Sequence, residues 1–146
     1  VYSPAHFWAQ LAGPAVVRTI DFAKLVKTEK PNQYLMCPPT ICRFAVADDP
    51  SILYPVPVEM LKKHFLAIVK ADRAEIVDEG AASLKLIVRT PYLAFPDLVN
   101  VEFFAQENGS TMAIYSRAQI GYSDFGVNRK RVKRWLLALD PLVTRS

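Results

Sequence analysis

The sequence predicts an α+β domain in which two helices cover one face of an antiparallel sheet. Two stretches carry apolar residues at helical spacing, and shorter segments of alternating apolar and polar residues lie between them. The 146 residues are 51% hydrophobic and 22% charged, which suits one globular domain with its own core. We therefore expect a single domain, with an N-terminal arm over residues 1–50 and an α+β core over residues 51–140.

Residues 1–50 predict an irregular arm, because prolines recur along them and interrupt any sustained periodicity. The one helical candidate runs from Asp21, a good capping residue, to Lys27, whose charge suits the negative end of a helix dipole. We expect this arm to wrap onto the core through the aromatic residues near its start, which are Tyr2, Phe7 and Trp8.

A short strand over residues 52–54 and a helix begin the core. Pro57 suits the first turn of that helix, where the missing amide donor costs nothing. Apolar residues then recur at helical spacing as far as Lys70, and together they mark one buried face. This face consists of Val58, Leu61, Phe65 and Ile68.

Two strands are predicted after this helix. Residues 74–79 form a weak strand that ends at Gly80, and residues 83–90 alternate more regularly. The apolar side chains that share one face of the second strand are Leu84, Leu86 and Val88.

A hairpin over residues 99–117 is predicted around Asn108 and Gly109. Both residue types reach positive φ at low cost, which favours a type I′ turn with these two as the loop residues. In that register Arg117 lies diagonal to Glu102, close enough for an ion pair across the strands.

The last predicted helix begins with Asn128 as its N-cap and ends before Pro141. Its buried stripe consists of Val132, Trp135, Leu136 and Leu139. From residue 52 onward the element order is βαββββα, with the strands in an antiparallel meander and both helices on one face. This order is similar to the TATA-binding-protein-like and half-helix-grip arrangements. The second face of the sheet is left for a partner, the arm or a ligand.

One long segment, residues 114–132, reads IYSRAQIGYSDFGVNRKRV and closely resembles the C-terminal signature of the bacterial domain-of-unknown-function family 1499. Residues 30–42, KPNQYLMCPPTIC, and residues 101–103, VEF, resemble two shorter motifs of the same family. The sequence departs from the family at Asn100, where an acidic residue is usual. The resemblance implies no established activity, and it implies export to the bacterial cell envelope behind an N-terminal signal or anchor.

Cys37 and Cys42 enclose four residues, and in an exported protein such a pair is expected to form a short disulfide. In a reducing compartment they would remain two thiols. A zinc site would have to recruit His6 and His64 from distant positions, so no metal and no cofactor is expected. The chain begins at Val1, and we expect a preceding signal or anchor to have been removed, with the domain in the periplasm or cell envelope.

The positive charge of the chain is local. Five of the 18 basic residues lie within residues 129–134, and 13 basic residues against 14 acidic residues remain without them. No aromatic platform is interleaved with this run, so nucleic acid is not an expected partner. The run is either the solvated face of a helix or a patch for anionic lipid.

One polar constellation could form a small site for an anion where the last strand meets the last helix. A helix N-terminus and two arginines would attract a carboxylate or phosphate there. The alternative is structural: the side chains satisfy turn and cap amides, while Arg117 pairs with Glu102 or Asp124. The constellation consists of Glu102, Arg117, Tyr122, Ser123, Asp124, Asn128 and Arg129.

Three hypotheses for function follow. The leading one is a cell-envelope domain without enzymatic activity that binds a small or lipidic ligand, or a partner protein, on the sheet face that the helices leave open. The second is a hydrolase-like enzyme that uses Arg117, Tyr122 and Asp124, although no nucleophile motif or phosphate loop supports it. The third is a purely structural interaction domain.

Overall fold

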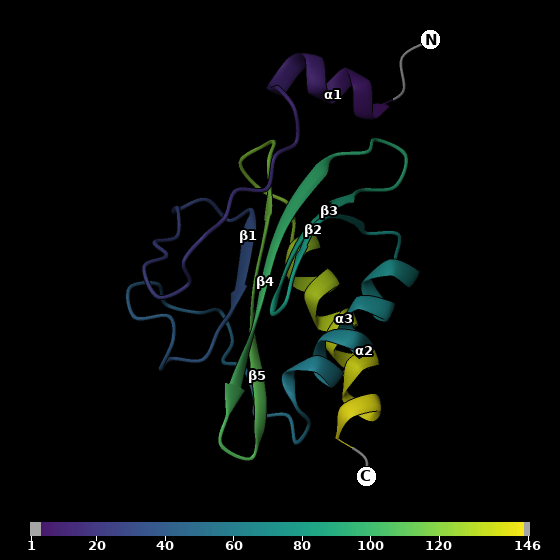
Figure 1. Cartoon of the computed structure of the whole chain (residues 1–146). Helices are drawn as coiled ribbons and strands as arrows, with labels where there is room; N and C mark the ends of the chain where they lie inside the picture. Colours follow the sequence, from purple (N-terminus) through teal and green to yellow (C-terminus); the bar gives the residue numbers. More distant parts are fainter. Residues whose placement is uncertain (1–3, 145–146) are drawn as a thin grey trace.

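The computed structural model describes residues 4–144, so the predicted contact of Tyr2 lies outside the described residues. Within these described residues, three helices and five strands make up the fold (Figure 1). In chain order they are α1 (Pro4–Ala12), β1 (Gln33–Met36), α2 (Val58–Ala71), β2 (Glu75–Gly80), β3 (Ser83–Arg89), β4 (Pro96–Gln106), β5 (Gly109–Ala118) and α3 (Val127–Val143).

The five strands form one antiparallel sheet in the order β1-β5-β4-β3-β2. Helices α2 and α3 lie side by side on one face of it (Figure 1). Between them and the sheet lies the main core, where the ring of Phe65 meets the Trp135 ring edge-on at 5.8 Å. The predicted α+β class, the antiparallel sheet and the placement of both helices on one face are confirmed.

The first strand of the sheet is β1, and the prediction of a strand over residues 52–54 was wrong. Only Tyr54 pairs there, in an isolated bridge to Ser110, while Ile52 and Leu53 stay half exposed. Pro50 and Pro55 flank this segment and lack the amide donors that a ladder needs. The order βαββββα survives, because β1 in the arm takes the place of the missing strand.

The arm is more regular than predicted. It begins with the helix α1, which the sequence pattern did not indicate, and residues 21–27 form a single turn where a helix was expected. Asp21 Oδ1 accepts a hydrogen bond from the Ala23 amide at 3.0 Å, which closes a local turn in competition with a helix. A seven-residue helix is also too short to nucleate without tertiary support.

The trailing part of the arm covers the sheet face opposite the helices. Phe22 is buried there together with the Cys37–Cys42 disulfide, against Ala113 and Tyr115 of β5. The predicted disulfide is therefore present, and this face is largely covered by the arm rather than open. Across residues 4–144 the structure offers no helix that is both long enough and apolar enough to cross a membrane.

The register of the β4–β5 hairpin differs from the predicted one by two residues. Val101 pairs with Ile114 and Gln106 pairs with Gly109, so the loop residues are Glu107 and Asn108. Of these two only Asn108 has a positive φ, which excludes the type I′ turn. Because the shift is even, each side chain keeps the face that the alternation predicts.

Helix α3 departs from its predicted ends. Its N-cap is Gly126, in the left-handed region at φ 80°, and Asn128 lies inside the first turn with its side chain buried. Pro141 lies inside the helix, which continues to Val143. A proline this close to the C-terminus removes only one backbone hydrogen bond, so the last turn persists. The predicted buried residues Val132, Trp135 and Leu139 are confirmed.

Candidate functional site

Two cavities meet at the turn that follows β3. One is a cleft of about 590 Å³ and the other is a cavity of about 360 Å³, and Thr90 and Pro91 line both. The smaller one, here called the apolar cavity, is lined mainly by apolar side chains. Its apolar lining comes from Leu93, Phe95, Ala118, Ile120, Phe125 and Val127.

The larger one, here called the arginine cleft, is lined by four guanidinium groups together with Asp72 and Glu75. Arg134 Nη2 donates to Asp72 Oδ2 at 2.6 Å, which fixes one of the four. Arg73 and Arg89 have no carboxylate within ion-pair distance in the described part of the chain, and both are exposed. The cleft therefore offers two free cations to solvent.

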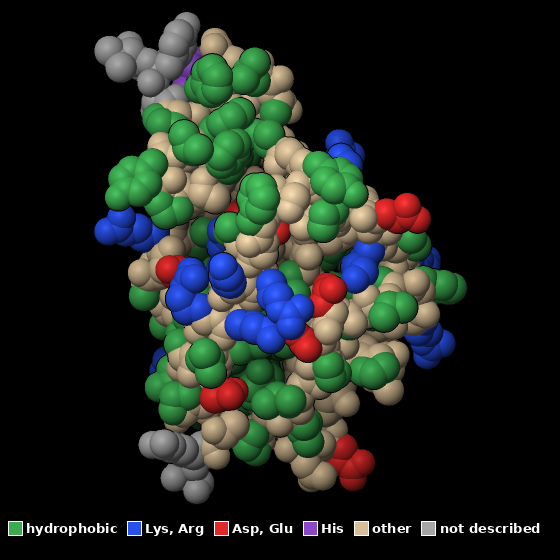
Figure 2. Space-filling model, turned by 180° about the vertical axis from the view of Figure 1, so that it is seen from behind, with side chains coloured by type: hydrophobic (Ala, Val, Ile, Leu, Met, Phe, Trp, Pro, Cys, Tyr) green, Lys and Arg blue, Asp and Glu red, His purple; other side chains and the backbone are tan. Residues whose placement is uncertain are grey.

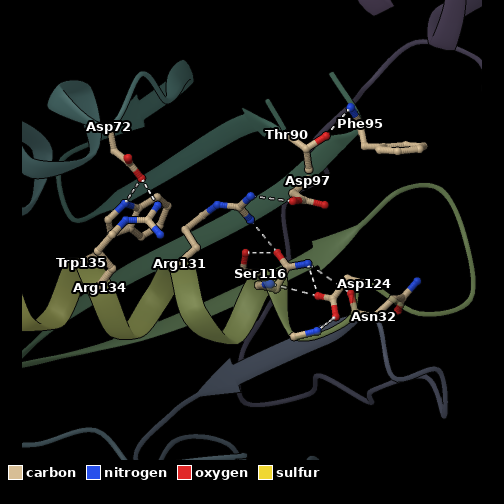
Figure 3. Close-up of polar contacts among 12 residues, drawn as sticks. Asn32, Asp72, Thr90, Phe95, Asp97, Ser116, Asp124, Arg131, Arg134 and Trp135 are labelled. Atoms are coloured by element: carbon tan, nitrogen blue, oxygen red, sulfur yellow. Dashed lines mark hydrogen bonds and ion pairs between the residues drawn. The ribbon is translucent and has the colours of Figure 1, made fainter. Parts of the chain in front are cut away.

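A buried ion pair separates the two cavities. Arg131 Nη2 donates to Asp97 Oδ2 at 2.7 Å (Figure 3). Asp97 lines the apolar cavity, and Arg131 lines the cleft. Asp97 is 2% exposed and Arg131 is 4% exposed. Burial raises the pKa of the Asp97 carboxyl, and the Arg131 guanidinium opposes that rise.

Asn128 is the centre of the polar network that holds this wall in place. Its Oδ1 accepts from Ser116 Oγ at 2.5 Å and from Arg131 Nη1 at 3.0 Å. Its Nδ2 donates to Asp124 Oδ2 at 2.7 Å and to the Asn32 carbonyl at 3.4 Å. The amide side chain thus uses both lone pairs and both protons, as a buried Asn must.

The turn over residues 90–95 forms the rim between the cavities. The Thr90 amide donates to the Phe95 carbonyl at 3.0 Å, and the Phe95 amide donates to Thr90 Oγ1 at 2.9 Å (Figure 3). Helix α1 braces this turn, because Trp8 Nε1 donates to the Leu93 carbonyl and the Trp8 ring contacts Phe95 at 4.5 Å. Of the aromatic residues predicted to pack onto residues 51–140, Trp8 does so, whereas Phe7 is 48% exposed and its ring contacts Trp8.

Three of the residues from the predicted constellation lie at this site. Asp124 Oδ1 accepts from the Gly126 amide at 2.8 Å, and its Oδ2 accepts from the Asn128 amide at 3.0 Å. Ser123 Oγ accepts from the Phe125 amide at 3.2 Å. These contacts are those of the structural alternative, in which turn and cap amides are satisfied. Ser123 and Asp124 also line the apolar cavity.

Two other members lie on the opposite face of the sheet. Arg117 Nη1 donates to Asn100 Oδ1 at 2.7 Å, and the guanidinium lies over the Tyr115 ring at 4.7 Å. Glu102 lines a separate cavity of about 270 Å³ between β3, β4 and the arm. The predicted Arg117–Glu102 ion pair was wrong, because the two-residue shift in register places Asn100, not Glu102, within reach of Arg117.

The last two members, Tyr122 and Arg129, are exposed. The Arg129 guanidinium lies 5.8 Å from the centre of the Tyr34 ring. The structure thus does not gather the seven residues into one site, nor does it bring Arg117 together with Asp124. In residues 4–144 no group of three or more His, Cys, Asp or Glu side chains could hold a metal ion.

We expect Glu102→Gln to stabilise the protein at neutral pH. Burial, and secondly the charge of Asp21, raise the pKa of Glu102 above its usual 4.5, so the charged form is favoured less in the folded chain than in the unfolded chain. The stability that the protonated Glu102 side chain contributes is complete below the pKa of the unfolded chain, and it is lost as pH rises through the pKa of the folded chain. The gain in unfolding free energy from Glu102→Gln should therefore shrink as pH falls toward 4.5. Urea unfolding curves of both proteins, recorded from neutral pH down to that value, measure this gain. An equal gain at every pH would contradict this cause.

The central residues Asp97, Arg131 and Ser116 were missed in the sequence. One signal for Arg131 was available, because it lies three residues after Asn128 and four before Trp135, on the buried stripe of α3. Its place in a basic run concealed this. Asn32 lies in the motif over residues 30–42, and Ser116 lies in the motif over residues 114–132. The polar network joins these two motifs in space.

Figure 2 shows the face that lies behind the view of Figure 1. Lys and Arg side chains gather across its middle, and hydrophobic side chains dominate the region above them, around α1. Positive charge and apolar surface are thus adjacent on one side of the molecule.

Comparison with known protein families shows a match over most of the chain. The model of a family described as "Protein of unknown function (DUF1499)" matches residues 26–139, which is well over half of the chain. The matched range contains the whole polar network and both cavities, and it leaves out α1. No curated protein matches the chain.

Proposed function

We propose that this chain, which belongs to the DUF1499 family, is a binding domain without enzymatic activity whose ligand is a small anionic amphiphile. The observation that carries the proposal is the shared edge between the two cavities. Thr90 and Pro91 line both, so a molecule lying across them places its anionic end among arginines and its hydrocarbon end in the apolar cavity.

The arginine cleft supports an anionic head group of carboxylate or phosphate chemistry. Within residues 4–144, Arg73 and Arg89 are the two cations of the cleft without a carboxylate partner, and a guanidinium can donate two parallel hydrogen bonds to either group. Arg89 Nη1 already donates to the Ala94 carbonyl at 3.1 Å, which orients the group at the rim. Arg131 and Arg134 are held by Asp97 and Asp72, and they contribute positive potential rather than free donors.

The apolar cavity supports a hydrocarbon tail. Its volume of about 360 Å³ falls in the range of pockets that enclose small ligands, and most of its lining is aliphatic or aromatic. The carboxylates at its floor, Asp97 and Asp124, are both occupied by hydrogen bonds from within the chain. They are therefore poorly placed to donate or abstract a proton, which favours binding over catalysis.

The disulfide supports a location of the domain in an oxidising compartment. Cys37 and Cys42 are joined, and such bonds persist where the environment is oxidising. We propose that the domain works in the bacterial cell envelope, where anionic amphiphiles such as fatty acids and lysophospholipids occur.

A fluorescence titration tests the proposed binding. Trp8 contacts Leu93 and Phe95, which line the apolar cavity, so occupation of that cavity should change its emission. Dodecyl phosphate, used below its micelle-forming concentration, is expected to bind at least about tenfold more tightly than dodecanol or inorganic phosphate, which each supply half of the contacts. A Trp8→Phe variant reports the remaining signal, from Trp135.

The double variant Arg73→Gln, Arg89→Gln is expected to lose about tenfold or more in affinity for dodecyl phosphate and to keep its affinity for dodecanol. The matched control is Lys130→Gln, Lys133→Gln, which removes two exposed cations of α3 outside the cleft. Equal losses in the two double variants would show that only net charge matters. Binding of dodecanol and dodecyl phosphate with the same affinity would contradict the proposal.

A further inference from the structure

The end of the molecule that carries α1 presents a group of large apolar side chains to solvent. They come from α1, from the turn over residues 90–95 and from the loop over residues 119–126, and we call this region the apical surface. Hydrogen bonds join its parts: Trp8 Nε1 donates to the Leu93 carbonyl, and Gln119 Nε2 donates to the Pro14 carbonyl at 3.2 Å. The exposed apolar residues are Phe7, Leu11, Tyr92, Leu93, Tyr122 and Phe125.

Tyr92 and Phe125 are unusual in both conformation and exposure. Tyr92 has φ 65° and Phe125 has φ 54°, in the left-handed region where bulky side chains are costly and Gly or Asn is cheaper. Their side chains bury very little area in the fold, because Tyr92 is 97% exposed and Phe125 is 89% exposed. Two aromatic rings held outward on strained turns point to a role outside the folded chain.

Acidic residues are scarce around the apical surface. Residues 4–16, 89–95 and 117–127 contain one acidic residue, Asp124, and its carboxylate is occupied by the first turn of α3. Exposed Arg89 lies at the base of the 90–95 turn, and exposed Arg129 and Lys130 follow the 119–126 loop. Aromatic rings flanked by cations match the interface of a bilayer with anionic lipids.

We propose that the apical surface inserts Tyr92 and Phe125 into the interface of a membrane rich in anionic phospholipid. This goes beyond the proposed ligand and also suits it, because Leu93 and Phe125 line the apolar cavity while remaining exposed. The mouth of that cavity thus opens on the surface that meets the bilayer. An amphiphile can pass between the bilayer and the cavity without its hydrocarbon chain crossing water.

Flotation with lipid vesicles tests this inference. The protein is expected to float with vesicles of phosphatidylcholine and phosphatidylglycerol, and to stay behind with phosphatidylcholine alone. The double variant Tyr92→Asn, Phe125→Asn should lower the partition coefficient at least about tenfold, since each ring contributes apolar area to the interface. Asn is favoured at positive φ, so this variant is expected to fold at least as stably as the parent.

The matched control is Phe44→Asn, Val46→Asn, which removes two exposed apolar side chains from the loop between β1 and α2 and should leave flotation unchanged. Because both double variants keep the net charge, general attraction of a basic protein to anionic vesicles is identical in all three. Equal flotation of the parent and the apical variant would overturn the proposal. A second result would also overturn it: the parent protein does not float with vesicles, and in sedimentation velocity the apical variant loses a self-association that the parent shows.

The two proposals can fail separately. The titration with dodecyl phosphate contains no vesicles and depends on Arg73 and Arg89, whereas flotation is read through Tyr92 and Phe125. Because Phe125 lines the apolar cavity, the single variant Tyr92→Asn, which lies outside both cavity linings, separates the two: loss of flotation with intact dodecyl phosphate binding in it would keep both proposals. Flotation without any amphiphile binding would retain the membrane contact and remove the cavity ligand.

Discussion

Arg131→Ala is expected to cost about 3–5 kcal/mol of unfolding free energy, because it leaves the Asp97 carboxylate buried without its counter-charge. The pair is joined at 2.7 Å with side chains that are 5% and 2% exposed, and Asn128 Oδ1 loses one of its donors at the same time. Urea unfolding followed by circular dichroism, with the disulfide intact, measures this loss.

Two further variants show whether the cost comes from the unpaired carboxylate. Arg131→Met combined with Asp97→Leu removes both charges and should recover most of the loss. Arg134→Ala breaks the exposed pair with Asp72, whose side chains are 58% and 32% exposed, and should cost no more than about 1 kcal/mol. Losses of the same size for Arg131 and Arg134 would show that the buried wall has no special place in the fold.

Asn128→Ala is expected to cost about 2–4 kcal/mol, because at least two buried polar groups lose a partner at about 1–3 kcal/mol each. Ser116 Oγ and Arg131 Nη1 both lose the Asn128 Oδ1 acceptor, while the Asn32 carbonyl keeps its hydrogen bond from the Ala118 amide at 2.9 Å. Ser116→Ala is the matched control, since it deletes a single bond and leaves Asn128 Oδ1 with Arg131; about 1 kcal/mol is expected.

Hydrogen exchange adds a local readout for the same variant. The Gly126 amide donates to Asp124 Oδ1, and Asp124 is held in turn by Asn128 Nδ2. In Asn128→Ala this amide should exchange faster than can be explained by the change in global stability. Unchanged protection at Gly126 would mean that the loop is held without Asn128.

The local sequence pattern was sufficient to predict the helices and strands that bury only one of their faces. Helices α2 and α3 each carry one apolar stripe, and β3 alternates between core and solvent, so their periodicity was readable. Strand β1 was missed because both of its faces are buried: Tyr34 and Met36 pack in the main core, and Leu35 packs under the arm. A strand between two cores reads as a continuous apolar run without alternation.

Features that depend on tertiary contacts could not be predicted from the local sequence pattern. The hairpin faces were predicted correctly while the pairing was shifted, because alternation specifies a face and leaves an even shift open. The site itself depends on where the 90–95 turn meets α3, two segments that are distant in sequence. Asp97 and Arg131 are likewise 34 residues apart, so neither signals the other in the sequence.

The site explains why residues from two sequence motifs, residues 30–42 and 114–132, are found together. Asn32, Ser116 and Asn128 fix the start of α3 against β1 and β5, and this positions Arg131 as the wall between the cavities. The polar network is thus structural, while the groups that remain available to a ligand are Arg73, Arg89 and the apolar lining. We expect ligand binding to be lost in Arg131→Ala even under conditions where the fold survives.

The most direct test of the account is to map the position of dodecyl phosphate by amide chemical shifts in ¹⁵N-labelled protein. The account predicts shifts confined to the rim of the two cavities, with Arg73, Arg89, Leu93 and Val127 among the residues affected. Shifts centred instead on Lys85, Asn100 and Glu102 would place the ligand under the arm and contradict it. The absence of any saturable shift would contradict the binding function itself.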